Sequence, residues 1–462
     1  MAMDLKKELL IRALDGKGEV LSLIGRYGEA IDSFQKVLKY SKNSHLTLAK
    51  TKRKIADVYQ NQGDYEIALR TFEEAQMFLT GDTVEEQLER AEIYISRSWV
   101  YKINGEMQRA IIEAETGLKI VDEISPATIP EQTKIKHKKI KANGLNSLGV
   151  IYRTKGEYDK ALELYQKDLK ICEEIGDKRG IGIASNNLGV FYHDKGEYDK
   201  AIELYQKYLK ISEEIADKQN IALANGNLGV ANHDRGEYNK AFELYQKALK
   251  ISEEIGDKKS ISRTISNLGS LFLELGELKK AEEYLIDAEK SVKEISDKYL
   301  LIDVFSYIAE LKIKQNLIKE ASEYGNSALK LAQELDLKSG KAKALLIKAR
   351  IEVADSRWQI ADRRFKEAIK LFEELNQPFE LAKAYYYYGE CLLRRTGVRE
   401  KIPRPFGKRA GVRGQEDEEG IARLKTDATE YFRKAKEIFE KIGARAWLKK
   451  VNELWSRIKK NP

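Results

Sequence analysis

The chain has little of what several protein classes depend on. It contains only two cysteines, Cys172 and Cys391, far apart in a sequence of 462 residues. Isolated cysteines are typical of small packing residues in a reducing compartment, so we expect a cytoplasmic protein. No run of 18 apolar residues occurs, and the start MAMDLKKELL lacks a long apolar stretch. These absences predict no secretory signal, no membrane span and no membrane partner.

Reactive motifs are also missing. The sequence contains no phosphate-binding glycine loop, no HExxH pair and no nucleophile elbow. We therefore predict a protein that is not an enzyme and that uses no cofactor and no metal. The net charge of +8 is modest for this length. It favours acidic partners but falls short of the dense basic face expected of a nucleic-acid binder.

What the chain does have is a repeat. The stretch LNSLGVIYRTKGEYDKALELYQKDLKICEEI, from Leu145 to Ile175, returns three times in altered form. Its Leu-Gly pair recurs at intervals of 40 residues, from Leu148 and Gly149 to Leu268 and Gly269. Self-similarity at a fixed step of this size indicates a stacked array rather than one globular core. Six prolines and 34% charged residues, among abundant helix formers, predict an all-α fold.

Each repeat is expected to fold as a hairpin of two helices, because apolar or small residues recur at spacings of three and four. Gly156 and its counterparts can end the first helix in a left-handed conformation. Asp177 and its counterparts can cap the start of the next hairpin. Gly149 and Ala161 are small where the two helices must approach closely. One hairpin cannot bury both of its faces, so neighbours must stack.

These residues resemble the tetratricopeptide repeat. The family pattern is met by Leu145, Leu148, Gly149, Tyr152, Ala161 and Tyr165. The step of 40 residues, instead of the usual 34, looks like the subtype found in kinesin light chains and LGN/Pins-type adaptors. The resemblance implies a right-handed superhelical solenoid in which the first helices of the repeats line a concave groove for a partner peptide.

The alanine that opens each second helix indicates about ten hairpins and a final capping helix. These alanines are Ala30, Ala68, Ala110, Ala161, Ala201, Ala241, Ala281, Ala321, Ala361 and Ala428. We expect divergent N-terminal repeats (1–124), a loop and helix extension (125–141), a regular array (142–380), a last repeat (381–443) and a C-terminal capping helix (444–462). The last repeat carries an inserted basic and acidic loop (396–420).

Polar residues stand in register on the first helices and are the candidate peptide-binding set. They are Asn146, Arg153, Asn186, Asn187, His193, Asn227, His233 and Asn267. An asparagine amide both donates and accepts, so it can bind a peptide backbone whatever its sequence. The alternative is that these groups bond only to the neighbouring repeat. The His-Asp pairs at His193 and His233 also suggest a metal or acid–base site, but no third ligand has suitable spacing.

The inserted loop is a second candidate site. Its basic residues are Arg399, Lys401, Arg404, Lys408, Arg409 and Arg413, and an acidic block follows them. A loop of this length in a compact array is functional or disordered. It can bind an acidic partner, fold over the groove or touch nucleic acid. The plainer interpretation is a loop whose two charge blocks partly neutralise each other.

Together these patterns predict a non-enzymatic adaptor or scaffold that binds a protein or peptide in the concave groove. The alternative is a sensory or regulatory subunit that controls a separate enzyme, such as a protease, kinase or cyclase. Self-association is a third possibility. The sequence does not favour nucleic acid as the partner.

Overall fold

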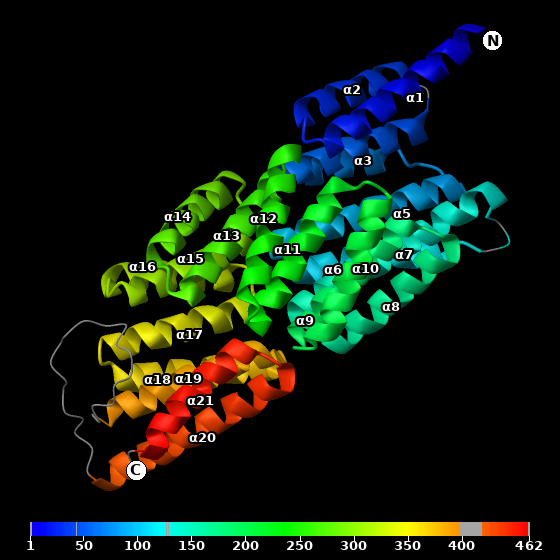
Figure 1. Cartoon of the computed structure of the whole chain (residues 1–462). Helices are drawn as coiled ribbons and strands as arrows, with labels where there is room; N and C mark the ends of the chain where they lie inside the picture. Colours follow the sequence, from blue (N-terminus) through cyan, green and yellow to red (C-terminus); the bar gives the residue numbers. More distant parts are fainter. Residues whose placement is uncertain (1, 43, 126, 128, 397–417, 461–462) are drawn as a thin grey trace. The chain divides into compact units, whose positions relative to one another are not determined.

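The computed structural model describes residues 2–42, 44–125, 127, 129–396 and 418–460, which form 21 helices and no strand (Figure 1). This confirms the all-α prediction. The chain divides into two compact units. Unit 1 comprises residues 1–187 with the short segment 254–257, and unit 2 comprises residues 188–253 and 258–462. One boundary falls within helix α9 (Lys178–Asp194), and the segment 254–257 begins within helix α12 (Tyr238–Ile255).

Unit 1 is a row of helical hairpins. Before α9 its helices are α1 (Ala2–Leu23), α2 (Tyr27–Tyr40), α3 (His45–Gln62), α4 (Tyr65–Met77), α5 (Val84–Ile103), α6 (Met107–Glu123), α7 (Glu131–Lys155) and α8 (Tyr158–Ile175). Within each pair, such as α5 and α6, the two helices pack against each other. The first helices α3, α5 and α7 also lie side by side, so they form one layer of the unit and the second helices form the other.

Unit 2 continues the same pattern. After the end of α9 its helices are α10 (Tyr198–Glu214), α11 (Lys218–Arg235), α12 (Tyr238–Ile255), α13 (Lys258–Leu275), α14 (Leu278–Glu294), α15 (Lys298–Lys314), α16 (Ile318–Glu334), α17 (Lys338–Ala354), α18 (Trp358–Glu374), α19 (Pro378–Arg395), α20 (Glu418–Ile442) and α21 (Arg445–Lys460). The first helices α11, α13, α15, α17 and α19 lie next to one another in sequence order.

The ten alanines used to count hairpins are all fully buried, and each lies on the second helix of one of ten helix pairs. The reason for small residues is visible at the glycines opposite them. A Cβ atom on Gly149 would lie 2.7 Å from the ring of Tyr165, and one on Gly229 would lie 2.5 Å from the ring of Tyr245. The tyrosine ring therefore packs directly on the glycine backbone, where any larger residue would clash.

The predicted helix ends are confirmed. Gly156 and Gly236 adopt φ values of 83° and 86°, in the left-handed region. Asn316 takes the same conformation at its turn, with φ 63°. The carboxylates of Asp217 and Asp297 accept hydrogen bonds from backbone N–H groups three residues later, as N-caps do. The local sequence therefore sets both the length and the stopping point of these helices.

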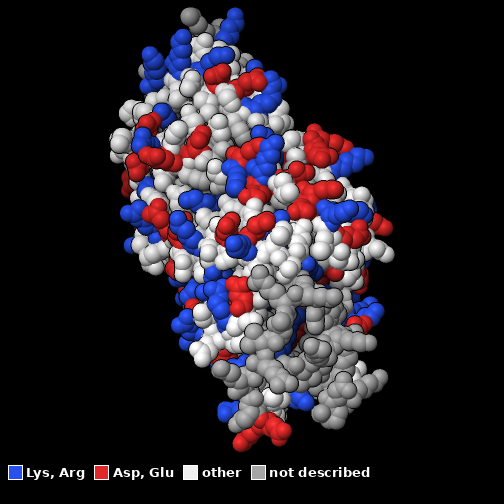
Figure 2. All heavy atoms as spheres, turned by 90° about the vertical axis from the view of Figure 1, so that its left-hand side faces the viewer, with Lys and Arg blue, Asp and Glu red and all other residues white. Residues whose placement is uncertain are grey.

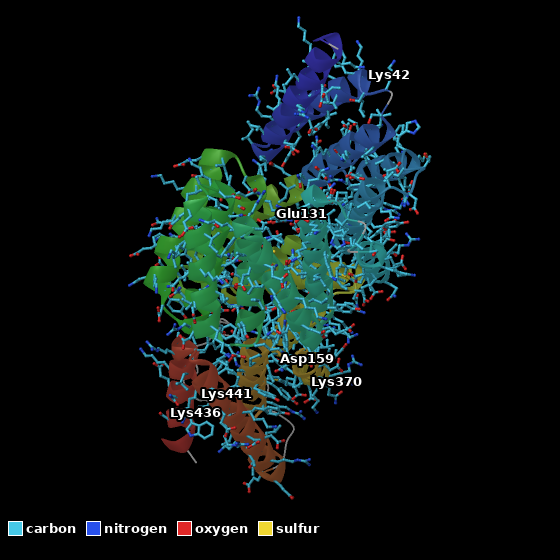
Figure 3. The ribbon with its side chains drawn as sticks, turned by 90° about the vertical axis from the view of Figure 1, so that its right-hand side faces the viewer. Lys42, Glu131, Asp159, Lys370, Lys436 and Lys441 are labelled. Carbon is cyan, nitrogen blue, oxygen red and sulfur yellow. The ribbon has the colours of Figure 1, made fainter. Side chains whose placement is uncertain are left out.

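The outer layer of the repeats is charged. Asp159 of α8, Lys370 of α18 and Lys441 of α20 are exposed and point away from the ribbon (Figure 3). On the face drawn in Figure 2, basic and acidic side chains alternate among the described residues without a large area of one sign. No helix in the described part of the chain has both the length and the apolar character needed to cross a bilayer.

The last helix covers the apolar face of the final repeat. Trp447, Val451 and Leu454 of α21 are buried in the cluster formed by α18, α19 and α20. The same part of the chain also reaches the beginning of unit 2. A Cβ atom on Gly196 would meet Ile442 at 2.7 Å, and one on Gly236 would meet Ala446 at 2.6 Å. The end of unit 2 therefore contacts the turns that follow α9 and α11.

A candidate ligand pocket in unit 2

Unit 2 contains a cavity of about 210 Å³ on the side of its first helices. Its wall is formed by α9, α11, α13, α15, α17 and α19, with one tyrosine each from α10 and α12. Because first helices lie side by side in the array, residues 40 positions apart occupy equivalent places on successive helices. The wall therefore takes one or more side chains from each repeat, and most of these are polar or charged.

At one end of the wall a histidine lies between two carboxylates. The Nε2 of His193 lies 3.0 Å from Oδ2 of Asp234, and its Nδ1 lies 3.9 Å from Oδ1 of Asp194. Burial alone would lower the pKa of His193, but the bonds to Asp194 and Asp234 outweigh it and raise the pKa to about 9. His193 is therefore a cation at neutral pH and neutralises part of this acidic end.

The equivalent histidine of the next repeat behaves differently. His233 packs its ring against Tyr238, with centroids 5.7 Å apart, and it has no hydrogen bond among the described residues. Burial lowers the pKa of His233, and the nearby carboxylate of Glu274 only partly opposes this. His233 is therefore neutral at pH 7 and presents a donor or acceptor nitrogen to the pocket.

The opposite part of the wall holds ion pairs that join neighbouring repeats. The Nζ of Lys343 lies 3.1 Å from Asp303, and the guanidinium of Arg350 lies 3.2 Å from Glu310. Arg350 also stacks over the ring of Tyr387, 3.9 Å from its centroid. Each ion pair links one first helix to the next. The pairs therefore hold neighbouring helices of the wall together and contribute to the electrostatic potential inside the pocket.

A third group of charges connects the wall to the C-terminal helix. Lys450 of α21 donates to Oε2 of Glu274 on α13 over 3.0 Å, and the hydroxyl of Tyr238 donates to the same oxygen over 3.2 Å. Burial would raise the pKa of Glu274, but Lys450, His233 and Lys383 lower it to about 2. Glu274 is therefore ionised throughout the physiological pH range.

Several polar groups of the wall have no hydrogen-bond partner in the described chain. The hydroxyls of Tyr198 and Tyr245 have no hydrogen-bond partner, and both residues are buried, with exposed fractions of 3% and 0%. The side chains of Asn267, Ser270, Tyr307 and Tyr387 also lack a side-chain hydrogen bond among the described residues. A buried polar group without a partner costs free energy, so this wall is suited to a ligand that supplies donors and acceptors.

The residues predicted from the sequence divide between the two units. His193, His233 and Asn267 line the pocket of unit 2. Asn146 and Asn187 belong to unit 1, where Nδ2 of Asn187 donates to Oδ1 of Asn146 over 2.5 Å. In that pair the asparagines bond to the neighbouring repeat, which was the alternative interpretation.

The remaining predicted residues do not line the pocket. Asn186 is buried and Arg153 is half-buried, and both lie in unit 1. Asn227 of unit 2 is half-buried on α11 but is not part of the pocket wall. The six basic residues of the inserted loop, from Arg399 to Arg413, lie outside the described residues.

Sequence reasoning missed the distal half of the wall. Tyr307 and Tyr387 occupy the positions equivalent to Asn267, 40 and 120 residues later in the array, and both line the pocket. Glu274 occupies the position equivalent to Asp234 and lines it as well. Following each position through the array, rather than following one residue type, would have found them. No group of three or more His, Cys, Asp or Glu residues suited to a metal ion occurs in the described part of the chain.

Comparison with known families agrees with this architecture. A family model for the tetratricopeptide repeat matches residues 141–214 and 220–294, and a second model of the same repeat matches residues 11–44. This chain is a tetratricopeptide repeat protein. No curated protein matches it in sequence.

Solved structures share the fold of this repeat protein at low identity. One is a Rap protein complexed with competence and sporulation factor, 14% identical, with a TM-score of 0.58 over 79% of this chain and 98% of that chain. Another is the Rap conjugation gene regulator of the plasmid pLS20 in complex with the Phr* peptide. It is 17% identical, with a TM-score of 0.52 over 82% of this chain and 97% of that chain.

Proposed function

We propose that this repeat protein is a non-enzymatic adaptor that binds a short peptide, or a short exposed segment of a partner protein, in the pocket of unit 2. The observation that carries the proposal is the set of unpartnered hydrogen-bonding groups in the described wall. Asn267, Ser270, Tyr307 and Tyr387 are the most telling members, because their side chains line the cavity and are partly exposed to it. A peptide offers one N–H donor and one C=O acceptor per residue. Its backbone can therefore supply the hydrogen-bond partners that these wall groups lack.

The shape of the site supports a short ligand. The end of unit 2 contacts the turns after α9 and α11 through Ile442 and Ala446. The cavity of about 210 Å³ is bordered by first helices from α9 to α19. A pocket of limited size with a few convergent polar groups fits a few residues of peptide better than a long extended segment.

The two Rap structures give independent support through the molecules bound in them. One was solved with competence and sporulation factor and the other with the Phr* peptide. An array of similar fold can therefore hold a peptide. The second of these proteins is described as a conjugation gene regulator. We accordingly keep a regulatory subunit, whose output depends on ligand binding, as the second candidate function.

A peptide-library selection tests the proposal. Synthetic random hexapeptides are selected on the immobilised full chain, and the enriched sequences are measured in solution by fluorescence anisotropy. The pocket variant is Ser270→Trp, which places an indole in the cavity, and the matched control is Lys370→Trp on the exposed side of α18. We expect enriched peptides to bind the control and to lose binding to Ser270→Trp. Equal binding to both variants, or no enrichment, would reject the proposal.

A further inference from the structure

Glu274 differs from the other carboxylates of the pocket. Each of the other five has a cationic partner within the wall: Asp194 and Asp234 share His193, and the pairs Asp303–Lys343, Glu310–Arg350 and Glu380–Lys383 complete the set. Glu274 takes its hydrogen-bonded cation from outside the described wall, from Lys450 of α21. These two residues are 176 positions apart in the sequence.

The wall by itself carries an excess of negative charge. Six carboxylates line it, against three lysine or arginine side chains and the charged His193. The low pKa of Glu274 keeps its carboxylate ionised. An ionised carboxylate in a partly desolvated cavity is stabilised strongly by a nearby cation and poorly by neutral groups. The pocket therefore favours an occupant that brings a positive charge to this place.

Lys450 can leave Glu274 without unfolding its helix. The residues around it hold α21 in place, because Trp447 is 3% exposed and Val451 is fully buried. The Lys450 side chain itself is 38% exposed, and its ammonium lies 4.1 Å from the centre of the Trp447 ring. A flexible four-carbon stem on a fixed helix can move its charge between a carboxylate and solvent.

We propose that Glu274 anchors a cationic side chain or amino group of the bound peptide, and that Lys450 is the intramolecular competitor for that carboxylate. The inference rests on the proposed function for the peptide nature of the ligand. Lys450 and a ligand cation repel each other at the same oxygen atoms, so binding of a cationic peptide displaces the lysine from Glu274. The C-terminal helix then loses its ionic contact with α13 when the pocket is occupied. Neutral and anionic ligands do not displace it.

A single capped amino acid tests the chemistry without a known natural ligand. The probes are Nα-acetyl-L-lysine N-methylamide and its neutral analogue Nα-acetyl-L-norleucine N-methylamide, titrated against the full chain by saturation-transfer NMR. Lys450→Met removes the competing charge, and we expect about tenfold tighter binding of the lysine probe, the value of one charge-assisted hydrogen bond. Glu274→Gln should lose the lysine probe. The norleucine probe should respond to neither change.

Two further variants guard against effects on folding. Lys449→Met removes the neighbouring, exposed lysine of the same helix and should bind like the wild type. Lys450→Arg keeps a competing cation and should also bind like the wild type. Thermal melts followed by circular dichroism check that each variant is folded.

Three results would overturn the inference. These are equal affinity of the lysine probe for wild type and Lys450→Met, full binding by Glu274→Gln, or no binding of the lysine probe to any folded variant. Failure of the proposed function would look different, since the hexapeptide library would then yield no sequence that is sensitive to Ser270→Trp. Peptides that bind the pocket but ignore both Glu274→Gln and Lys450→Met would keep the function and reject this inference.

Discussion

His193 of α9 and Asp234 of α11 face each other across adjacent repeats, with 3.0 Å between Nε2 and Oδ2. The bond joins two first helices by side chains that are 41 residues apart. Asp194 approaches the same imidazole from its own helix, so the histidine carries its charge in a site that is only partly open to water. A pairing of this kind links the acidic end of the pocket to the stability of unit 2.

The pairing predicts a pH-dependent contribution of His193 to stability. The folded pKa of about 9 lies above the ordinary value of 6.5, so the imidazolium stabilises the fold fully below pH 6.5 and loses this contribution as pH rises through 9. The shift corresponds to about 3 kcal/mol at most. Urea unfolding of wild type and His193→Gln should therefore show a larger difference in free energy at pH 6 than at pH 10.

His233→Gln is the matched control for that experiment, with the opposite sign. The pKa of His233 is lowered by burial, so any stabilisation by the neutral imidazole is present above pH 6.5 and is lost as pH falls. The difference between wild type and His233→Gln should grow with rising pH. Parallel pH profiles for the two variants would contradict the assigned charge states.

Gly229 should tolerate no side chain. A Cβ there would lie 2.5 Å from the Tyr245 ring, so Gly229→Ala should cost about 1–3 kcal/mol through overpacking. Gly226, one turn earlier on the same helix α11, has open space around it, because a Cβ added there would meet nothing within 4 Å. Gly226→Ala should therefore stabilise the helix by up to about 1 kcal/mol. Chemical denaturation of both variants measures the contrast, and equal effects would reject the packing explanation.

Tyr245 should tolerate the loss of its hydroxyl. Its hydroxyl is buried without a partner in the described chain, so Tyr245→Phe should leave the free energy of unfolding unchanged or raise it by about 1 kcal/mol. The same change should leave peptide affinity unchanged, because the hydroxyl oxygen is buried and does not face the open cavity. Tyr238→Phe is the control, because it loses a bond to Glu274 and should lower stability. Loss of stability in Tyr245→Phe would show that the hydroxyl already has a hydrogen-bond partner in the folded chain.

An asparagine at this repeat position should contribute to peptide binding only where its side chain has no other hydrogen-bond partner. Asn267 has no partner among the residues that the structure describes, whereas Asn187 is bonded to Asn146. Asn267→Ala should weaken the binding of a selected peptide about tenfold, which corresponds to the loss of one or two hydrogen bonds. Asn187→Ala should leave the affinity of that peptide unchanged. Anisotropy titrations with one labelled peptide compare the two. The reverse order would move the site to unit 1.

Local features of the fold could be read from the sequence because each depends on few neighbours. The buried alanine, the Gly149–Tyr165 contact and the left-handed turn at Gly156 all arise within one hairpin. Near-identical copies then repeat the same signal along the chain. This is why the hairpin count and the positions of the turns were predictable.

The distal wall of the pocket was not predictable in the same way. Its residues change type between repeats, from Asn267 to Tyr307 and then to Tyr387, so the pattern of asparagines stops before the register does. The pairing of Lys450 with Glu274 depends on how the end of unit 2 meets its beginning. No local sequence signal encodes a contact between residues so far apart.

Photo-crosslinking tests the central claim most directly. A library-selected peptide carrying one benzophenone residue is irradiated with the full chain, and the crosslinked sites are mapped by mass spectrometry. We predict crosslinks to the first helices of unit 2, within α11, α13, α15, α17 and α19, that disappear in Ser270→Trp. Crosslinks confined to unit 1 or to exposed second helices, and unaffected by Ser270→Trp, would contradict a peptide site in this pocket.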